Sequence, residues 1–234
     1  GQWCTRLGYE AGYSNSTGNS MTALGYQAGY YNTTDNNTFV GMEAGLYSTS
    51  ADSCVFIGTG AGKGISGTRL TGNNNVLIGR NAGSVLQGAI NDDTCVGHDS
   101  GGSLTSGGSN TFLGSDSGGK VTTGSQCISI GAQSMKGGGA VITGSGNTAV
   151  GYVAGYSLQG AANSNVFVGR EAGYSVTTGT NHVLIGDNAE ASGTGTSNEI
   201  VLGNNATGTA ASTVLFGAGV NTCLLYTSPS PRDS

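Results

Sequence analysis

The groups that could perform chemistry are few in this chain and lie far apart in its sequence. His98 and His182 are the only two histidines among 234 residues, and the repeat described below separates them by about 24 Å. His98-Asp99 and the nearby Asp92-Asp93 offer metal ligands, although a polar loop explains the same residues. Gly62-Lys63-Gly64 lacks the Ser or Thr and the strand-to-helix setting of a phosphate-binding loop. We expect no catalytic residue, no metal site and no cofactor, and hence no enzyme.

Composition and charge argue against two classes of partner. The net charge is −5, and the eight Lys and Arg residues are scattered from Arg6 to Arg232, so no basic stripe exists that could follow a nucleic-acid backbone. No apolar run approaches the roughly 18 residues of a membrane-spanning helix. We expect no nucleic-acid partner and no membrane contact by this segment.

An internal repeat organises the chain. The segment Asn165–Tyr174 reads NVFVGREAGY, and Asn37–Gly45 and Asn147–Tyr156 are near copies of it. The Gly after the aliphatic residue anchors each copy and occurs thirteen times, at spacings of 14 to 21 residues. Such a repeat predicts rungs that must stack, because one rung cannot bury its apolar face alone. The anchors, predicted to be structural turn glycines, are Gly8, Gly25, Gly41, Gly58, Gly79, Gly97, Gly114, Gly131, Gly151, Gly169, Gly186 and Gly203, with Gly217 closing the series.

Each copy predicts a short strand followed by a tight bend. The residue before the anchor is large and apolar in all thirteen copies, and the residue two positions before that one is β-branched. This period of two indicates a strand rather than a helix. A small residue usually follows three positions after the anchor, and Asn, Ser, Thr and Gly fill most of the remainder. We predict an all-β fold, a parallel β-roll (β-solenoid) whose thirteen coils each hold a strand, a bend, a short second strand and a polar return loop.

The repeat predicts one elongated domain over residues 1–219. With strands about 4.8 Å apart, its coils would form a rod roughly 60 Å long. The longer spacings after Gly58 and Gly131 predict loop extensions at 63–74 and 135–146. Residues 220–234 contain both prolines and no anchor, and we interpret residues 224–234 as a translated sequencing artefact.

Both faces of the predicted strands are apolar, which is typical of a strand covered on both sides. We expect the residue before each anchor, such as Val40, to point into the roll. The preceding residue would then point outward, and we predict that copies of the chain pack on one another there. This candidate inter-chain face comprises Phe39, Phe56, Leu77, Phe112, Phe167 and Leu184.

Three further residue types recur at fixed positions of the repeat. Cys4, Cys54 and Cys127 belong to coils too distant for disulfides, so we expect buried free thiols, with pairing between chains as the alternative. A recurrent Asn predicts a side-chain amide ladder at Asn37, Asn75, Asn110, Asn147 and Asn165. The candidate exposed aromatics could bind a glycan or a collagen-like partner, although stacking between rungs is the interpretation we favour. They are Tyr9, Tyr26, Tyr152 and Tyr174.

The unit Asn-Thr-x-aliphatic-Gly-x-x-Ala-Gly-Tyr, complete at Asn147–Tyr156, resembles the head repeats of trimeric autotransporter (YadA-like) adhesins. It is equally similar to repeats of phage tail-fibre proteins. The resemblance extends from Cys4 to about Gly219, although these coils of about 17 residues are longer than the adhesin unit. It implies a left-handed parallel β-roll, three chains around one axis, and a location outside the cell, on a cell or virion surface.

These features predict a structural and adhesive rod that attaches to a host cell, matrix or other surface, with a host-surface protein or glycan as partner. A tail-fibre shaft involved in receptor binding is the first alternative. An ice-binding solenoid is the second, and it requires a flat outward array of regularly spaced Thr. The pairs Thr33-Thr34, Thr122-Thr123 and Thr177-Thr178 lie in loops of unequal length and do not form such an array.

Overall fold

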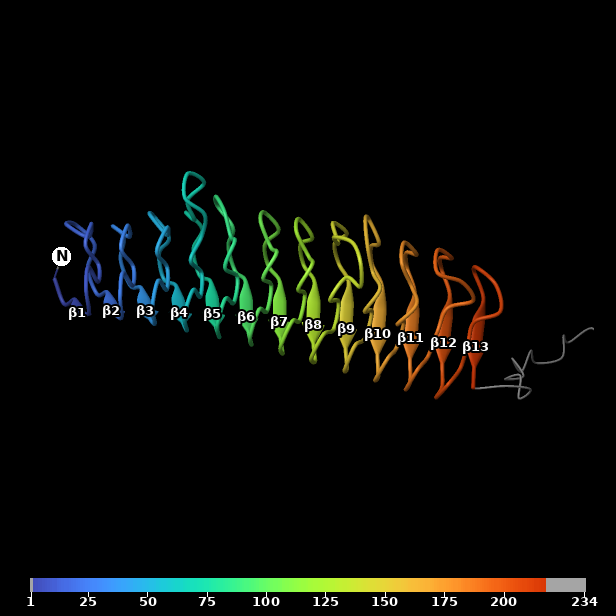
Figure 1. Cartoon of the computed structure of the whole chain (residues 1–234). Helices are drawn as coiled ribbons and strands as arrows, with labels where there is room; N and C mark the ends of the chain where they lie inside the picture. Colours follow the sequence, from blue (N-terminus) through green and yellow to red (C-terminus); the bar gives the residue numbers. More distant parts are fainter. Residues whose placement is uncertain (1, 218–234) are drawn as a thin grey trace, which may run out of the picture.

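The strands of the roll lie one above another in chain order (Figure 1). A computed structural model describes residues 2–217, which contain thirteen three-residue strands and no helix. All strands are parallel and form one sheet in sequence order, which confirms the predicted parallel β-solenoid. The strands are β1 (Thr5–Leu7), β2 (Thr22–Leu24), β3 (Thr38–Val40), β4 (Val55–Ile57), β5 (Val76–Ile78), β6 (Thr94–Val96), β7 (Thr111–Leu113), β8 (Ile128–Ile130), β9 (Thr148–Val150), β10 (Val166–Val168), β11 (Val183–Ile185), β12 (Ile200–Leu202) and β13 (Val214–Phe216).

Equivalent residues of successive repeats pair directly. Val40 pairs with Ile57, and Ile57 pairs with Ile78. Each repeat position therefore becomes a column that runs along the rod. We number a coil after its strand and a position by its offset from the anchor glycine, so that Tyr152 and Arg170 both lie at position +1 of their coils.

The two faces of the strands are the reverse of those expected. The central residue is buried in every strand from β2 to β12. The predicted inter-chain face is therefore wrong, because its residues fill the interior of the roll. The flanking residues, such as Val166 and Val168, face outward and are partly exposed. The six residues that must be reassigned to the core, all without exposed area, are Phe39, Phe56, Leu77, Phe112, Phe167 and Leu184.

The wall opposite the strands consists of small residues in stacked turns. Position +3 is Ala or Ser in coils 1 to 12, and all of these side chains are buried. The segment is a turn in coils 1 to 10, and only an isolated parallel bridge between Glu190 and Thr207 occurs in coils 11 and 12, so the predicted second strand does not form. The turns nevertheless hydrogen-bond between coils, as where the Gly12 N–H donates to the Ala28 carbonyl at 2.8 Å. Small side chains here allow the two walls of the roll to approach closely.

Residue sizes on the two walls compensate for each other. Where the centre of the strand is Phe39, position +4 is Gly45, and a Cβ there would lie 2.5 Å from the phenyl ring. Where the centre is the small Ser129, position +4 is Met135, which is fully buried. Close packing of the interior therefore couples these two positions in coils 3 and 8.

The return loop also contributes to the core, which its polar composition did not indicate. The extension predicted at 63–74 projects beyond its neighbours between β4 and β5 (Figure 1), and an antiparallel bridge between Ile65 and Thr68 closes it. The loops supply a further set of fully buried residues, Leu70, Leu86, Leu104, Val121, Ile142, Leu158 and Val176.

The asparagines of the predicted amide ladder line the interior at position −4, but they bond mainly to the backbone, and only Asn165 and Asn147 bond to each other side chain to side chain, at 3.0 Å. The Oδ1 atom of Asn37 accepts the N–H of Cys54 at 2.9 Å, and that of Asn110 accepts the N–H of Cys127 at 2.9 Å. The side-chain amide group of Asn147 donates to a return-loop carbonyl at 2.7 Å. Buried backbone and side-chain polar groups thus satisfy one another along the rod.

Residue 1 and residues 218–234 lie outside the described part of the chain. The domain boundary at residue 219 and the interpretation of residues 224–234 as an artefact therefore stay predictions. Within residues 2–217, no helix is long and apolar enough to cross a membrane.

Candidate functional site

The anchor glycines form a backbone column at the ends of the strands. From Gly8 to Gly203 their φ angles lie between +127° and +147°, a range that residues with a Cβ rarely adopt. A Cβ added to any anchor from Gly8 to Gly186 would lie 2.2–2.7 Å from the carbonyl of the next anchor. The bend and the close approach both require glycine, so this column positions the neighbouring side chains and offers none of its own.

Position +2 holds a second unusual backbone conformation. Its non-glycine residues have φ between +49° and +60°, the left-handed helical region. Asn, Asp, Glu or Gln occupy ten of the twelve positions, and the exceptions are Gly60 and Val153. Val153 is β-branched, so this conformation costs it about 1–3 kcal/mol. Its side chain is only 6% exposed, and the column of polar side chains is interrupted there.

The tyrosines stack between rungs, as the favoured interpretation predicted. The ring centroids are 5.4 Å apart for Tyr9 and Tyr26 and 5.2 Å apart for Tyr156 and Tyr174, with the ring planes nearly parallel. Tyr152 differs, because it pairs with no other ring within residues 2–217 and is 55% exposed. Three of the four candidate aromatics therefore have a structural role, and Tyr152 has no such partner.

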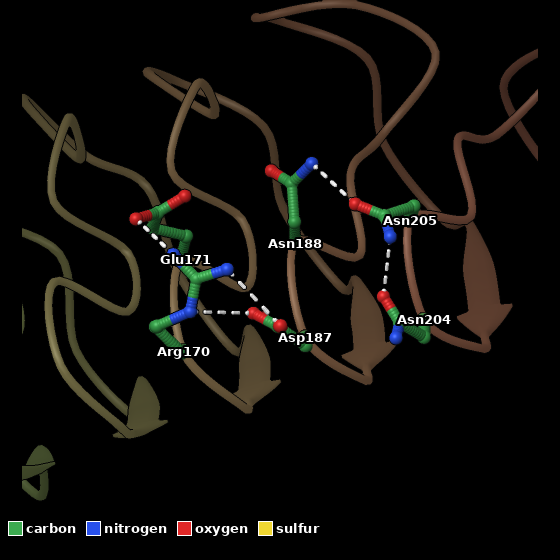
Figure 2. Close-up of polar contacts among 6 residues, drawn as sticks. All are labelled: Arg170, Glu171, Asp187, Asn188, Asn204 and Asn205. Carbon is green, nitrogen blue, oxygen red and sulfur yellow. Dashed lines mark hydrogen bonds and ion pairs between the residues drawn. The ribbon is translucent and has the colours of Figure 1, made fainter.

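Charged side chains next to the tyrosines join neighbouring coils (Figure 2). Arg170 contacts Glu171 through Nη1 and Oε1 at 2.6 Å, and Asp187 through Nε and Oδ1 at 3.0 Å. The amide of Asn188 donates to Oδ1 of Asn205 at 3.1 Å. The hydrogen bond to Asp187 is the main cause that raises the pKa of Arg170. These exposed ion pairs stabilise the fold little, but they neutralise much of the charge of Glu171.

A group of potential metal ligands lies in the middle of the rod. Side-chain ligand atoms of His98, Asp99 and Asp116 lie within 4.8 Å of one another. The Arg80 guanidinium lies against Nε2 of His98, and Nζ of Lys136 is 3.3 Å from Oδ2 of Asp116. Because Arg80 occupies Nε2 of His98 and Lys136 already pairs with Asp116, we assign no metal site here.

Asp93 does not join that group, although the sequence places it close to His98. It is fully buried in the −4 column, where Oδ1 accepts the N–H of Asn110 at 2.7 Å. Its Oδ2 atom is buried and has no hydrogen-bond partner. Burial raises the pKa of the Asp93 carboxyl from 3.8 to about 7. Asp93 is therefore an interior titratable group rather than a surface ligand.

Three thiols and the second histidine are also enclosed, whereas Cys4, which was expected to be buried, is partly exposed. Cys54, Cys95 and Cys127 are buried free thiols, and burial raises the pKa of Cys54 to about 11, which suppresses its thiolate form. His182 is buried, with Nε2 2.7 Å from the Thr196 carbonyl and Nδ1 accepting the N–H of Glu199. Both ring nitrogens therefore have backbone partners, which fits a structural role for His182.

A groove of about 550 Å³ crosses coils 8 to 11. Of its lining residues, Tyr152 and Tyr174 were predicted as candidates, whereas Gln133, Asn188 and Glu190 were not. The available signal was Val153, a hydrophobic residue in an otherwise polar column. The groove combines aromatic rings, amides and the carboxylates of Glu171 and Glu190.

Comparison with known proteins does not identify the chain. The family that the repeat resembles therefore stays a prediction. No protein-family model matches the chain, and no curated protein matches it.

Proposed function

We propose that the chain is a structural and adhesive rod, assembled from three copies, that attaches a cell or virion surface to a host cell, matrix or other surface. The outward face of the sheet is the observation that carries this proposal. Positions −3 and −1 of all thirteen strands hold only Thr, Val, Ile, Leu or Phe, without one charged residue. An uncharged face that runs the full length of a rod is typical of an interaction surface.

The size of this face suits assembly from copies of the chain. Thirteen strands about 4.8 Å apart span roughly 58 Å, and three residues add a width of about 10 Å. Each chain thus offers about 600 Å². Three chains that turn this face toward a common axis would divide it between two neighbours each and bury about 1,800 Å² in total, an area on the scale of a specific interface. Identical uncharged faces do not repel one another, so further copies of the chain are suitable occupants.

The resemblance to adhesin and tail-fibre repeats supports three copies around one axis and an extracellular location. A tail-fibre shaft would use the same architecture, and the outward face does not distinguish a phage tail fibre from a cell-surface adhesin. In both cases the rod would hold binding surfaces at a distance from its point of attachment.

Charge placed on the outward face tests the assembly. We expect the wild-type chain to sediment as a trimer and a Val150→Glu/Val168→Glu variant to sediment as a folded monomer, because burying the carboxylates is costly. Ala161→Glu adds a carboxylate to the exposed return loop of coil 9 and should leave the trimer intact. A wild-type chain that sediments as a stable monomer at micromolar concentration would refute the assembly.

The reassigned faces also favour ice binding as a second candidate. Position −3 carries an outward Thr in six coils, and these residues are spaced regularly because the strands are in register. The array is not uniform, since Val or Ile occupies the other seven coils. Thermal hysteresis in the monomeric fraction, abolished by Val168→Glu, would replace the adhesive proposal with this one.

A further inference from the structure

The groove across coils 8 to 11 is a built feature of the rod. We propose that it binds a neutral oligosaccharide of about three sugar units. This inference rests on the proposed attachment function and deepens it, because it names the chemical class that the rod would recognise.

Two interruptions in the surface columns create the groove. At position +2, the buried Val153 replaces the long polar side chains that Gln133 and Glu171 supply in the neighbouring coils. At position +5, the column Tyr156–Tyr174 ends at coil 11 with the small Ala191. The groove spans four coils, hence about 14 Å between the first and the last. Its volume of about 550 Å³ is that of a typical small-ligand site.

The aromatic rings of the groove have surfaces free for a ligand. Tyr156 covers one face of the Tyr174 ring, and Ala191 in the next coil leaves room beside the other face. Tyr152 has no ring partner within the described residues, and the two rings are 55% and 41% exposed. The C–H face of a pyranose packs on such rings, while the phenol hydroxyl stays available for hydrogen bonds.

The polar groups around these rings match sugar hydroxyls. A hydroxyl both donates and accepts, and so does the side-chain amide of Gln133. The Nδ2 of Asn188 is held by Asn205, which leaves its Oδ1 as an acceptor (Figure 2). The carboxylate of Glu190 is fixed by the N–H and hydroxyl of Ser175, at 3.1 and 3.4 Å.

Charge argues for a neutral ligand rather than a cation. The nearby Glu171 is already paired with Arg170 at 2.6 Å. Glu190 is the remaining carboxylate of the groove, and burial raises its pKa. A site for an organic cation would need acceptors and ring faces alone, whereas this groove also offers the amide donor of Gln133.

Backbone strain marks the same place. Val153 adopts φ +49°, a conformation that is costly for a β-branched residue and that Gln, Glu or Asn adopt in the neighbouring coils. Strain of this kind clusters at binding sites, where a function maintains it. Here the strained residue is also the one that opens the groove.

Titration of the intact trimer with cellotriose, tri-N-acetylchitotriose and maltotriose tests the proposal. Binding is measured by saturation-transfer NMR and by calorimetry. We expect at least one trisaccharide to bind, and Tyr174→Ala to weaken it about tenfold. Tyr13→Ala is the matched control, because Tyr13 also lies at position +5 and ends a stack with Tyr30, but it does not line the groove. That control should bind like the wild type.

Val153→Gln separates binding from stability. The substitution restores the usual residue type of the column, so we expect a higher unfolding temperature together with about tenfold weaker saccharide binding. Unchanged affinity in Val153→Gln or in Tyr174→Ala would overturn the assignment. Binding of tetramethylammonium in place of all three sugars would overturn it as well.

The experiment distinguishes this inference from the proposed function. A wild-type trimer that binds none of the three sugars overturns the saccharide groove and leaves the rod. A chain that binds saccharide but is a monomer supports the groove and overturns the three-chain assembly.

Discussion

Asp93 interrupts the interior amide column with a carboxylate whose Oδ2 atom has no partner. Below about pH 4 the carboxyl is protonated in both the folded and the unfolded chain. Between pH 4 and about 7, the folded-state pKa, only the unfolded chain readily releases this proton. The free energy of unfolding should therefore fall as the pH rises through this window, by about 4 kcal/mol in total.

Asp93→Asn should remove most of this pH dependence. The amide would continue the pattern of Asn75 and Asn110, with Nδ2 free to donate to a return-loop carbonyl as theirs do. We expect the variant to be more stable than the wild type at pH 8 and nearly equal at pH 4, measured by chemical denaturation. Asp92→Asn is the control, since Asp92 is exposed. An unaltered slope in Asp93→Asn would show that another group titrates.

Gly114→Ala should destabilise the rod strongly. The backbone at Gly114 has φ +130°, and a Cβ there would lie 2.7 Å from the carbonyl of Gly131. Strain in this region costs about 1–3 kcal/mol, and displacement of the next coil adds to it, so we expect a loss of at least about 2 kcal/mol by denaturant unfolding. Gly139→Ala has open space around it and should change the stability by less than about 1 kcal/mol.

The anchor glycines could be predicted because one backbone requirement recurs in every coil. For Val153 the repeat predicts the backbone conformation but not the groove beside it. Its left-handed conformation follows from its position in the repeat, but the groove that it opens depends on the lengths of side chains in three neighbouring coils. In the sequence the groove is visible only as a valine at a position that is polar in most other coils. Such a substitution does not predict a ligand unless the geometry of the neighbouring side chains is known.

A strand that ends at the anchor glycine was predicted in every coil, and the structure has one there, yet the inward face of these strands was assigned wrongly. Three-residue strands with apolar residues on both faces have a period of two in either orientation, so alternation cannot decide between them. The deciding signal lies across the coil, where Phe39 is matched by Gly45 and Ser129 by Met135. Side chains whose sizes compensate identify the two walls of the roll that are in contact. The sequence of one strand considered alone does not show this compensation.

Substitutions on the two faces of β10 should differ sharply in effect. Phe167 is fully buried, so Phe167→Ala should cost about 3–5 kcal/mol through lost burial and a cavity. Val166 faces outward, and Thr occupies its position in six coils, so Val166→Thr should cost less than about 1 kcal/mol. Both are measured by denaturant unfolding, and equal losses would contradict the assigned orientation.

The solenoid could be predicted because its architecture follows from a one-dimensional repeat. Each coil contacts only its neighbours in the sheet, so knowledge of one coil and its spacing gives the rod. Assembly between chains is a different matter, because it depends on which face is outward. Reassigning the faces moved the predicted contact between copies from the phenylalanine column to positions −3 and −1.

The length of the rod should control the strength of its assembly. A chain that ends at Gly131 keeps β1 to β8, and these coils should stay folded, because the contacts of a solenoid are local. Its outward face is shorter by five strands of thirteen, so we expect the trimer to dissociate at a concentration at least about tenfold higher. Far-UV circular dichroism checks the fold, and sedimentation over a concentration series checks the assembly. If the shortened chain associates as tightly as residues 2–217, a local patch in the first eight coils holds the copies together, and the full-length face does not.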